Sequence, residues 1–359
     1  MPHTLLTVSG VIDPAIHAKI ARGERPRADY LEMAHAFDAD VLDYAGARAT
    51  SGAFGALLEK IGGRNVLLAW ACWTRRKKYR VIFTDGEQVG IPLAALLKFL
   101  GRGGARHLMI VHILNVGKKM LFFRALGVQS HIDIFFCYAT WQKKFIEAEL
   151  RVPAARVVWT PFMVDDQFFA PAQAQPRDDR AAQMICAVGL EFRDYPTLMR
   201  AVDGLDVRVI IAAASPWSKR ADTTQDQEIP ANVTVKKFSQ LELRQVYADS
   251  AFLVMPLYNV NFQAGVTAIL EAMAMARAVI CSRTPGQTDV IVEGETGVYV
   301  PPGDPAALRA AIQELLAQPE RARQMGRAGR VRIEAQMNLA QYVARLKHYV
   351  KLDNPKTKP

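Results

Sequence analysis

The stretch that decides the fold runs from Asn261 to Ala276 and reads NFQAGVTAILEAMAMA, and the short apolar run Ala278-Val-Ile-Cys-Ser282 follows it. The pattern predicts a helix that begins just after Gly265 and then a buried strand. The first backbone N–H groups of a helix have no partner within it, and the helix dipole adds partial positive charge there. The stretch therefore predicts a site for a diphosphate at the start of this helix.

Short β-like runs alternate with helical patterns on both sides of this stretch. The expected strands are 4–9, 40–44, 81–84, 107–113, 132–138, 157–160, 184–188, 207–212, 233–236, 251–255, 278–281 and 298–300. The expected helices are 28–37, 51–78, 92–100, 118–126, 141–150, 195–202, 240–248, 266–276, 288–291 and 305–318, with a further helical stretch over 319–352. Strands that are apolar on both faces and separated by helices predict an α/β fold with parallel sheets covered on both sides.

The length of 359 residues exceeds what one hydrophobic core usually serves, so two domains are expected. The polar, proline-bearing stretch 171–179 is typical of a linker. We therefore predict an N-terminal domain over 1–170 and a C-terminal domain over 171–335. A final helix within 336–359 is expected to pack back toward the first domain.

Composition favours a cytoplasmic protein. The N-terminus lacks a basic region followed by an apolar run, so no secretory signal is expected. The apolar run 66–73 is far shorter than the ~20 residues that cross a bilayer. The four cysteines are scattered without a CxxC pair, which indicates neither a disulfide framework nor a zinc site.

The net charge of +10 is unevenly distributed. Seven basic residues and no acidic one lie between Lys60 and Arg80, close to Trp70 and Trp73. Such a stretch fits a solvated helix end, an anionic membrane surface or a nucleic acid. No nucleic-acid-binding motif accompanies it, so a nucleic-acid partner is not expected, whereas peripheral contact with a membrane stays open.

The stretch 261–276, followed by Thr284-Pro-Gly-Gln-Thr-Asp289 and Thr296-Gly-Val-Tyr-Val-Pro-Pro-Gly-Asp304, resembles the donor site of the retaining glycosyltransferases of family 4, glycosyl transferases group 1. The resemblance covers 184–318 well and the residues before 161 only in outline. It implies the GT-B fold, in which two Rossmann-like α/β/α domains with parallel sheets face a central cleft. It also implies a nucleotide-diphosphate sugar as donor and retention of the anomeric configuration.

The resemblance assigns roles to residues of the central stretch. The backbone amides near Gly265, Val266 and Thr267 would hold the phosphates, and Glu271 would accept hydrogen bonds from the ribose hydroxyls. Gln263 stands where the family has the first glutamate of its pair, so its amide would hydrogen-bond the transferred sugar. A neutral amide there leaves a catalytic use of this position open. Ala276 also replaces a glycine that is usual in the family.

Two cations are candidates for binding the leaving diphosphate. Arg193 lies in the loop after the expected strand 184–188, where the family carries basic residues, and a fixed cation there would stabilise the transition state. Lys219, after the expected strand 207–212, would supply a second positive charge. A solvated surface cation is the alternative reading of each.

Three residues of the first domain are candidates for catalysis or for the acceptor side. His112 is a candidate catalytic residue at the end of an expected strand, where ligands bind in open α/β sheets. The resemblance implies that a histidine here lies close to the transferred sugar, and its imidazole would donate to a sugar hydroxyl or position the acceptor; a buried histidine that only packs is the alternative. Glu87 follows the preceding strand and is a candidate for contacting the acceptor, and Asp85 would cap the helix that begins there. Gly10 follows the first strand and allows close approach of a ligand to the backbone.

The chain lacks the motifs of several other enzyme classes. GxGxxG with a downstream acid, GxxxxGK[ST], HExxH and the nucleophile elbow do not occur. No Asp-x-Asp stands at a strand end, so neither a metal nor another cofactor is expected beside the nucleotide sugar. The acceptor would be a glycan, a lipid or a small molecule. A sugar-nucleotide epimerase on the same fold and a non-catalytic binding or scaffold protein are the alternatives.

Overall fold

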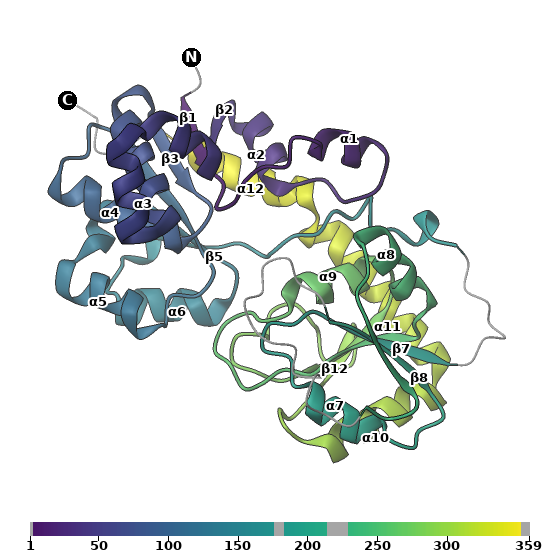
Figure 1. Cartoon of the computed structure of the whole chain (residues 1–359). Helices are drawn as coiled ribbons and strands as arrows, with labels where there is room; N and C mark the ends of the chain where they lie inside the picture. Colours follow the sequence, from purple (N-terminus) through teal and green to yellow (C-terminus); the bar gives the residue numbers. More distant parts are fainter. Residues whose placement is uncertain (1–2, 176–182, 214–228, 353–359) are drawn as a thin grey trace. The chain divides into compact units, whose positions relative to one another are not determined.

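The computed structural model describes residues 3–175, 183–213 and 229–352 (Figure 1). The chain divides into two compact units. The first unit comprises Met1–His17, Ala28–Thr160 and Tyr342–Pro359, and the second comprises Ala18–Arg27 and Pro161–Gln341. The linker expected over 171–179 lies later than this division, and the domain limits expected from the sequence stay a prediction.

The first unit is built on a parallel sheet of six described strands in the order β2-β1-β3-β4-β5-β6. The strands are β1 (Thr4–Thr7), β2 (Ala39–Leu42), β3 (Val81–Thr84), β4 (Arg106–Val111), β5 (Ile134–Cys137) and β6 (Val157–Trp159). Every residue of β1, β3, β4 and β5 is buried, because helices cover both faces of the sheet.

The helices of the first part of the chain are α1 (Ile16–Ala21), α2 (Asp29–Phe37), α3 (Tyr44–Arg75), α4 (Glu87–Phe99), α5 (Gly117–Leu126) and α6 (Thr140–Glu149). The last helix, α12 (Leu339–Lys351), brings its residues from Tyr342 onward into the first unit. There the hydroxyls of Tyr138 and Tyr342 lie 3.0 Å apart, and the ring of Tyr349 meets Phe136 of β5 edge-on at 5.5 Å.

The second unit repeats the plan with six described parallel strands in the order β12-β11-β10-β7-β8-β9. These are β7 (Met184–Val188), β8 (Arg208–Ala212), β9 (Val233–Lys236), β10 (Phe252–Met255), β11 (Ala278–Ser282) and β12 (Gly297–Val300). Its helices are α7 (Tyr195–Val202), α8 (Gln240–Asp249), α9 (Val266–Ala274), α10 (Pro305–Ala317) and α11 (Pro319–Arg332). Short 3-10 or π turns elsewhere are Arg76–Lys78, Val128–His131, Ala154–Arg156, Pro171–Gln173 and Ile333–Met337.

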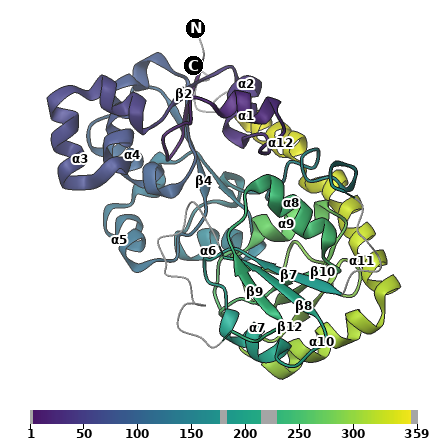
Figure 2. The same ribbon diagram turned by 45° about the vertical axis from the view of Figure 1, so that its right-hand side comes forward.

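Two apolar clusters hold the second sheet between its helices. Residues of α8 and α9 pack on one face, and residues of α7 and α10 pack on the other (Figure 2). The sheet is therefore a covered central layer, and its strand ends are the places where polar groups can meet a ligand.

All the expected strands are present, with ends that differ by at most two residues, but the helix expected over 288–291 is wrong. This segment has no helix; Val290 and Ile291 are buried in the core. The Arg332 side chain donates to the backbone oxygens of Asp289 (2.9 Å) and Val290 (3.0 Å). A side chain therefore satisfies carbonyls that a helix would otherwise have used.

Further differences concern helix limits. The structure adds α1, which the sequence pattern does not predict. Helix α4 begins at Glu87, so Pro92 lies inside it rather than at its start. The helical stretch expected over 319–352 is divided into α11, a π turn and α12. Helix α3 begins earlier than expected and contains two glycines with non-helical backbone, Gly52 and Gly63.

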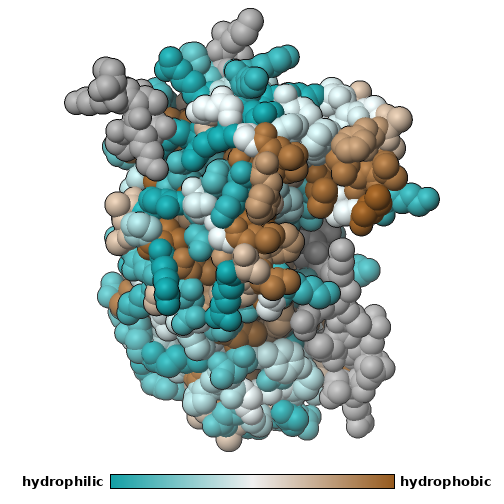
Figure 3. All heavy atoms as spheres, turned by 90° about the vertical axis from the view of Figure 1, so that its left-hand side faces the viewer, coloured by the Kyte–Doolittle hydropathy of each residue, from teal (hydrophilic) through white to brown (hydrophobic). Residues whose placement is uncertain are grey.

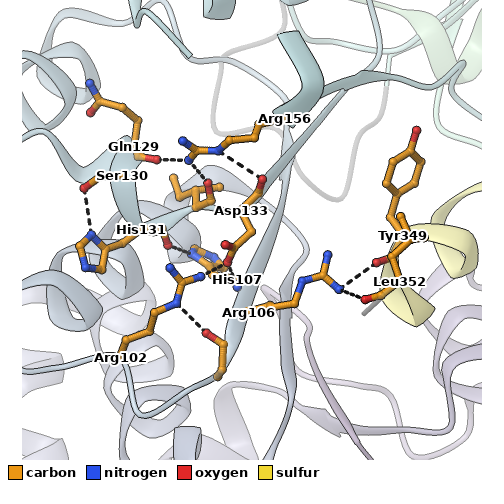
Figure 4. Close-up of polar contacts among 12 residues, drawn as sticks. Arg102, Arg106, His107, Gln129, Ser130, His131, Asp133, Arg156, Tyr349 and Leu352 are labelled. Atoms are coloured by element: carbon orange, nitrogen blue, oxygen red, sulfur yellow. Dashed lines mark hydrogen bonds and ion pairs between the residues drawn. The ribbon is translucent and has the colours of Figure 1, made fainter. Parts of the chain in front are cut away.

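A polar cluster at the amino ends of β4 and β5 is a feature that sequence analysis missed (Figure 4). The Asp133 carboxylate forms an ion pair with Arg102 and accepts the backbone N–H of His107 at 2.7 Å. Burial lowers the pKa of His107 to about 3, which keeps its ring neutral. Arg106 donates to the backbone oxygens of Tyr349 (3.2 Å) and Leu352 (2.6 Å) at the end of α12. The cluster therefore ties the strand starts to the last helix.

In the part of the chain that the structure describes, we find no helix with enough length and apolar character to span a bilayer.

Candidate functional site

Helix α9 follows β10, and it begins beyond the carboxyl end of that strand, at the surface of the second unit. Gly265 is the N-cap of this helix and has a left-handed backbone, with φ of +77°. The first helical hydrogen bond runs from the N–H of Ile269 to the oxygen of Gly265 at 3.1 Å. The amides of Val266 and Thr267 precede that bond and point out of the helix end, as a diphosphate site requires.

Arg193 lies beside this helix end. A Cβ atom built on Gly265 would stand 3.4 Å from the guanidinium carbon of Arg193. The side chain is 5% exposed, and it donates to the backbone oxygens of Val188 (2.9 Å) and Glu191 (2.6 Å). Burial lowers the pKa of Arg193 from its ordinary value. The structure thus brings together Arg193 and the start of α9, the two groups that the sequence analysis expects to hold the diphosphate.

Gly189 makes room for this arginine. Its φ is +102°, and a Cβ atom there would overlap the guanidinium of Arg193. The hydroxyl of Tyr195 donates to the backbone oxygen of Gly189 and fixes the turn. A side chain at this position would be strained and would displace the cation, so glycine is required here for two reasons.

Glu271 is almost fully buried on α9, with 7% of its surface exposed. The hydroxyl of Tyr247 donates to its carboxylate at 2.8 Å. Burial raises the pKa of Glu271 to about 7, although the hydrogen bond from Tyr247 opposes the shift. The carboxylate therefore titrates near neutral pH, and its charged form would gain from further hydroxyl donors.

Gln263 precedes the helix start, and its side-chain oxygen is buried without a hydrogen-bond partner. Gln287 was missed by sequence analysis, although it lies in the turn after β11 that belongs to the recognised pattern. It is fully buried, and its amide nitrogen donates to the backbone oxygen of Ala264 at 2.7 Å. Its side-chain oxygen and the hydroxyl of Thr284 also lack partners. Each of these buried oxygens can accept a further hydrogen bond.

Lys219 lies outside the described residues, so its expected role as a second cation stays a prediction.

In the first unit, Glu87 and His112 lie together. Glu87 is 2% exposed, and its carboxylate accepts the backbone N–H groups of His112 (2.8 Å) and Ile113 (3.0 Å) and the amine of Lys119 (2.7 Å). The pKa of Glu87 is lowered from its ordinary value. Burial alone would raise it, but the positive charges of His112 and Lys119 and the hydrogen bond from the His112 backbone N–H outweigh the effect of burial. Its carboxylate thus holds the loop after β4 in place.

The ring of His112 is half-buried at the carboxyl end of β4. Its Nε2 atom lies 2.9 Å from the backbone oxygen of Asp85, and its ring centre lies 5.5 Å from that of Tyr138. The side-chain nitrogen of Gln142 donates to the backbone oxygen of His112 at 2.5 Å. Both the backbone and the ring of His112 are therefore held in place, which suits a residue that orients another group.

The sequence analysis expects Asp85 to cap the following helix, and this expectation is wrong, because the N-cap of α4 is Gly86. The carboxylate of Asp85 instead accepts the hydroxyl of Thr7 (2.6 Å) and both the N–H (2.5 Å) and the hydroxyl (2.9 Å) of Ser9. These bonds fix the loop after β1, where a Cβ atom on Gly10 would meet nothing within 4 Å. The backbone at Gly10 is thus open to close approach.

Among the described residues, we find no group of three or more His, Cys, Asp or Glu side chains arranged to hold a metal ion.

Residues 187–318 match the sequence profile of the family described as glycosyl transferases group 1. The chain is 28% identical to the GDP-mannose-dependent alpha-(1-6)-phosphatidylinositol monomannoside mannosyltransferase of Mycolicibacterium smegmatis, over 68% of this chain and 71% of that protein. It is 37% identical to a D-inositol 3-phosphate glycosyltransferase of Corynebacterium diphtheriae, over 24% of this chain and 19% of that protein.

Solved structures share the fold. HepE of Anabaena in complex with UDP-glucose superposes with a TM-score of 0.71 at 12% identity, over 97% of this chain and 99% of that chain. Sucrose-phosphate synthase of Thermosynechococcus elongatus gives a TM-score of 0.67 at 20% identity, over 81% and 78%. The expected fold is confirmed, and the profile match extends the likeness to sequence. The chain has the GT-B fold, and its residues 187–318 carry the sequence profile of the glycosyl transferases group 1 family.

Proposed function

We propose that the chain transfers a sugar from a nucleotide-diphosphate donor to an acceptor, with retention of the anomeric configuration and without a metal ion. One observation carries the proposal. The buried guanidinium of Arg193 and the amides that open α9 converge on one point beside Gly265. A fixed cation next to free amides suits two phosphates of a donor.

The chemistry of transfer explains why this arrangement matters. When the sugar–phosphate bond breaks, negative charge builds up on the diphosphate that leaves. Arg193 is held by two backbone oxygens and Gly265 by the helix, so neither group has to reorganise as the charge develops. Groups fixed in this way stabilise the transition state more than the bound donor.

The remaining donor contacts would come from neighbouring residues. Glu271 would accept hydrogen bonds from the ribose hydroxyls, and Gln263 would bind the transferred sugar through its amide. The unpartnered oxygen of Gln263 supports this role, because a sugar hydroxyl would supply the missing donor. The amide is uncharged and acts as neither an acid nor a base near neutral pH, so the proposed role is hydrogen bonding rather than proton transfer.

The acceptor would meet the first unit near His112 and the open backbone at Gly10, with Glu87 holding the His112 loop. The relatives named above act on a phosphatidylinositol mannoside and on an inositol phosphate, which supports a lipid or a polyol among glycan, lipid and small-molecule acceptors. A lipid acceptor would suit a cytoplasmic protein bound peripherally to the inner face of the membrane.

A thermal-shift screen with UDP, GDP, ADP and TDP tests the donor site. A nucleotide that binds only the folded chain stabilises it by about 2.7 kcal/mol at a concentration one hundred times Kd. Such a nucleotide must therefore raise Tm. We expect UDP or GDP to give the largest shift. Arg193→Ala should abolish it, whereas Arg200→Ala, an exposed arginine on α7, should not.

Turnover then separates the alternatives. Release of nucleotide together with a glycosylated acceptor supports the transferase. An isomerised sugar nucleotide formed without acceptor would identify an epimerase. A nucleotide-induced rise in Tm with no turnover on a panel of polyol, glycan and lipid acceptors would favour a non-catalytic binding protein. If none of the four nucleotides raises Tm, the donor site itself is refuted.

A further inference from the structure

Helix α3 contains a separate helical segment with an apolar face. Its backbone breaks at Gly52 (φ 58°, ψ −157°) and at Gly63 (φ 79°, ψ 176°), so residues 53–62 form a piece of their own. Within it, Phe54 is 52% exposed, Leu57 51% and Ile61 77%. The spacing of three and four residues places these side chains on one side of the helix.

The opposite side of this segment is held by the rest of α3. A Cβ atom on Gly55 would lie 3.1 Å from the side chain of Leu67, and Glu59 forms an ion pair with Arg48 at 2.5 Å. The segment is thus anchored through a small residue and an ion pair while its large apolar side chains face water. Large apolar groups gathered on a solvent-exposed helix face are typical of an interaction surface.

A row of aromatic rings joins this face to the basic end of α3. Phe54 contacts Trp70 edge-on at 5.0 Å, Trp70 stacks on Trp73 at 5.0 Å, and the Arg76 guanidinium lies 3.8 Å above the ring of Trp73. The exposed side chains of Lys77 and Lys78 follow directly. Figure 3, which looks onto α3, α4 and α5, shows hydrophobic side chains gathered on this face among hydrophilic ones.

Charge identifies the partner. Seven basic residues and no acidic one lie between Lys60 and Arg80. Apolar side chains on one face, tryptophans behind them and lysines and arginines beside them are the features of helices that lie in the interface of anionic bilayers. A neutral protein partner would not require this charge.

We propose that residues 53–62 dock on an anionic lipid bilayer, with Phe54, Leu57 and Ile61 in the boundary between headgroups and acyl chains. The basic residues from Lys60 to Arg80 would contact the headgroup phosphates. This inference rests on the membrane contact of the proposed function and sharpens it to one face. Its test measures binding to lipid and does not depend on the transfer reaction.

The test is flotation of the full chain with vesicles at about 0.15 M salt. We expect binding to vesicles that contain phosphatidylglycerol and little binding to pure phosphatidylcholine. The triple variant Phe54→Ser, Leu57→Ser, Ile61→Ser should bind at least about tenfold more weakly, because three buried apolar groups are lost. The matched control is Leu241→Ser with Val331→Ser, two exposed apolar residues of the second unit, and should bind as the natural chain does.

A second variant, Lys77→Glu with Lys78→Glu, should lose binding at low salt, where attraction to the headgroups is strongest. Unchanged Tm and an unchanged nucleotide-induced shift would show that each variant is folded, so failure of the donor site is recognised separately. The proposal is overturned if the natural chain ignores anionic vesicles or if the triple variant binds them equally well. It is also overturned if the triple substitution instead abolishes a dimer seen by sedimentation, since the face would then bind a second copy.

Discussion

In each of the two units a buried charged side chain fixes a loop by hydrogen bonds to its backbone, and the two charges have opposite signs. In the first unit, the buried carboxylate of Glu87 collects backbone N–H groups of the loop after β4. In the second, the buried guanidinium of Arg193 donates to the backbone oxygens of Val188, at the end of β7, and of Glu191, in the loop that follows. Each charge fixes a loop at the carboxyl end of a strand, which is where ligands bind in such sheets.

The two charges differ in the other groups that lie beside them. The amine of Lys119 also bonds the carboxylate of Glu87, and the residue that this network orients is His112. Arg193 instead lies against Gly265, at the start of a helix whose first amides point outward. We infer that the Glu87 charge serves the architecture of its loop, whereas the Arg193 charge serves a bound anion as well.

The sharpest test of this comparison is Arg193→Ala. We expect kcat/KM for transfer to fall by about 10³-fold, equivalent to about 4 kcal/mol, because a fixed donor to the leaving group is removed. Steady-state kinetics with the nucleotide sugar identified by thermal shift measures the loss. Arg200→Ala is the control and should keep full activity; equal activity of the two variants would remove the reason to assign Arg193 a role in transfer.

Glu87→Ala tests the structural half of the comparison. Two backbone N–H groups and the amine of Lys119 lose their acceptor, so the free energy of unfolding should fall by about 3 kcal/mol. Urea unfolding measures the change, and Glu149→Ala, an exposed glutamate of the same unit, should alter it by less than about 0.5 kcal/mol. Nucleotide binding by the folded variant should stay unchanged. A weaker nucleotide affinity without a loss of stability would contradict the structural role.

Glu271→Gln sharpens the comparison through pH. Because the pKa of Glu271 is raised from 4.5 to about 7, the folded chain is favoured while this group is protonated. The protonated Glu271 side chain contributes fully to the free energy of unfolding below pH 4.5, and this contribution is lost as pH rises through 7. The glutamine variant should lack this loss and should gain about 2 kcal/mol relative to the natural chain at pH 8.

The affinity for nucleotide should increase with pH, whereas the contribution of Glu271 to stability decreases. Ribose hydroxyls donate to the charged carboxylate, so the affinity of the natural chain for nucleotide should rise between pH 6 and pH 8. The glutamine variant should show a flatter pH dependence, measured by calorimetry at several pH values. A parallel dependence in both proteins would mean that Glu271 does not contact the nucleotide.

The smallest expected effect separates backbone strain from contact at Gly265. Gly265→Ala and Gly294→Ala both force a side chain into the left-handed region, with φ of +77° and +76°. Only at Gly265 would the new Cβ meet a neighbour, the sulfur of Met255 at 2.7 Å. We expect Gly265→Ala to cost about 1 kcal/mol more than Gly294→Ala and to weaken nucleotide binding severalfold. Equal costs in urea unfolding would count against the close packing of this helix start.

Residue patterns were sufficient for all the expected strands and for the family resemblance of 187–318. Every expected strand is present because runs of Val, Ile, Leu and aromatics buried on both faces have few other solutions. The pattern failed at 288–291, where Arg332 takes the carbonyls, and at Asp85, whose partners Thr7 and Ser9 lie 76 to 78 positions away in the chain. Contacts so distant in sequence leave no periodic signal.

The sequence by itself determined the α/β class, the two-sheet plan and the resemblance of 187–318 to the glycosyl transferases group 1 family, because periodicity, glycine positions and helix starts are local properties of the chain. Only the tertiary structure decided that Arg193 lies against Gly265, that Glu87 holds the His112 loop and that Gln287 is buried beside the helix start. It also decided that Phe54, Leu57 and Ile61 face water. Burial and pairing depend on what packs against a residue, and that is fixed only when the whole chain has folded.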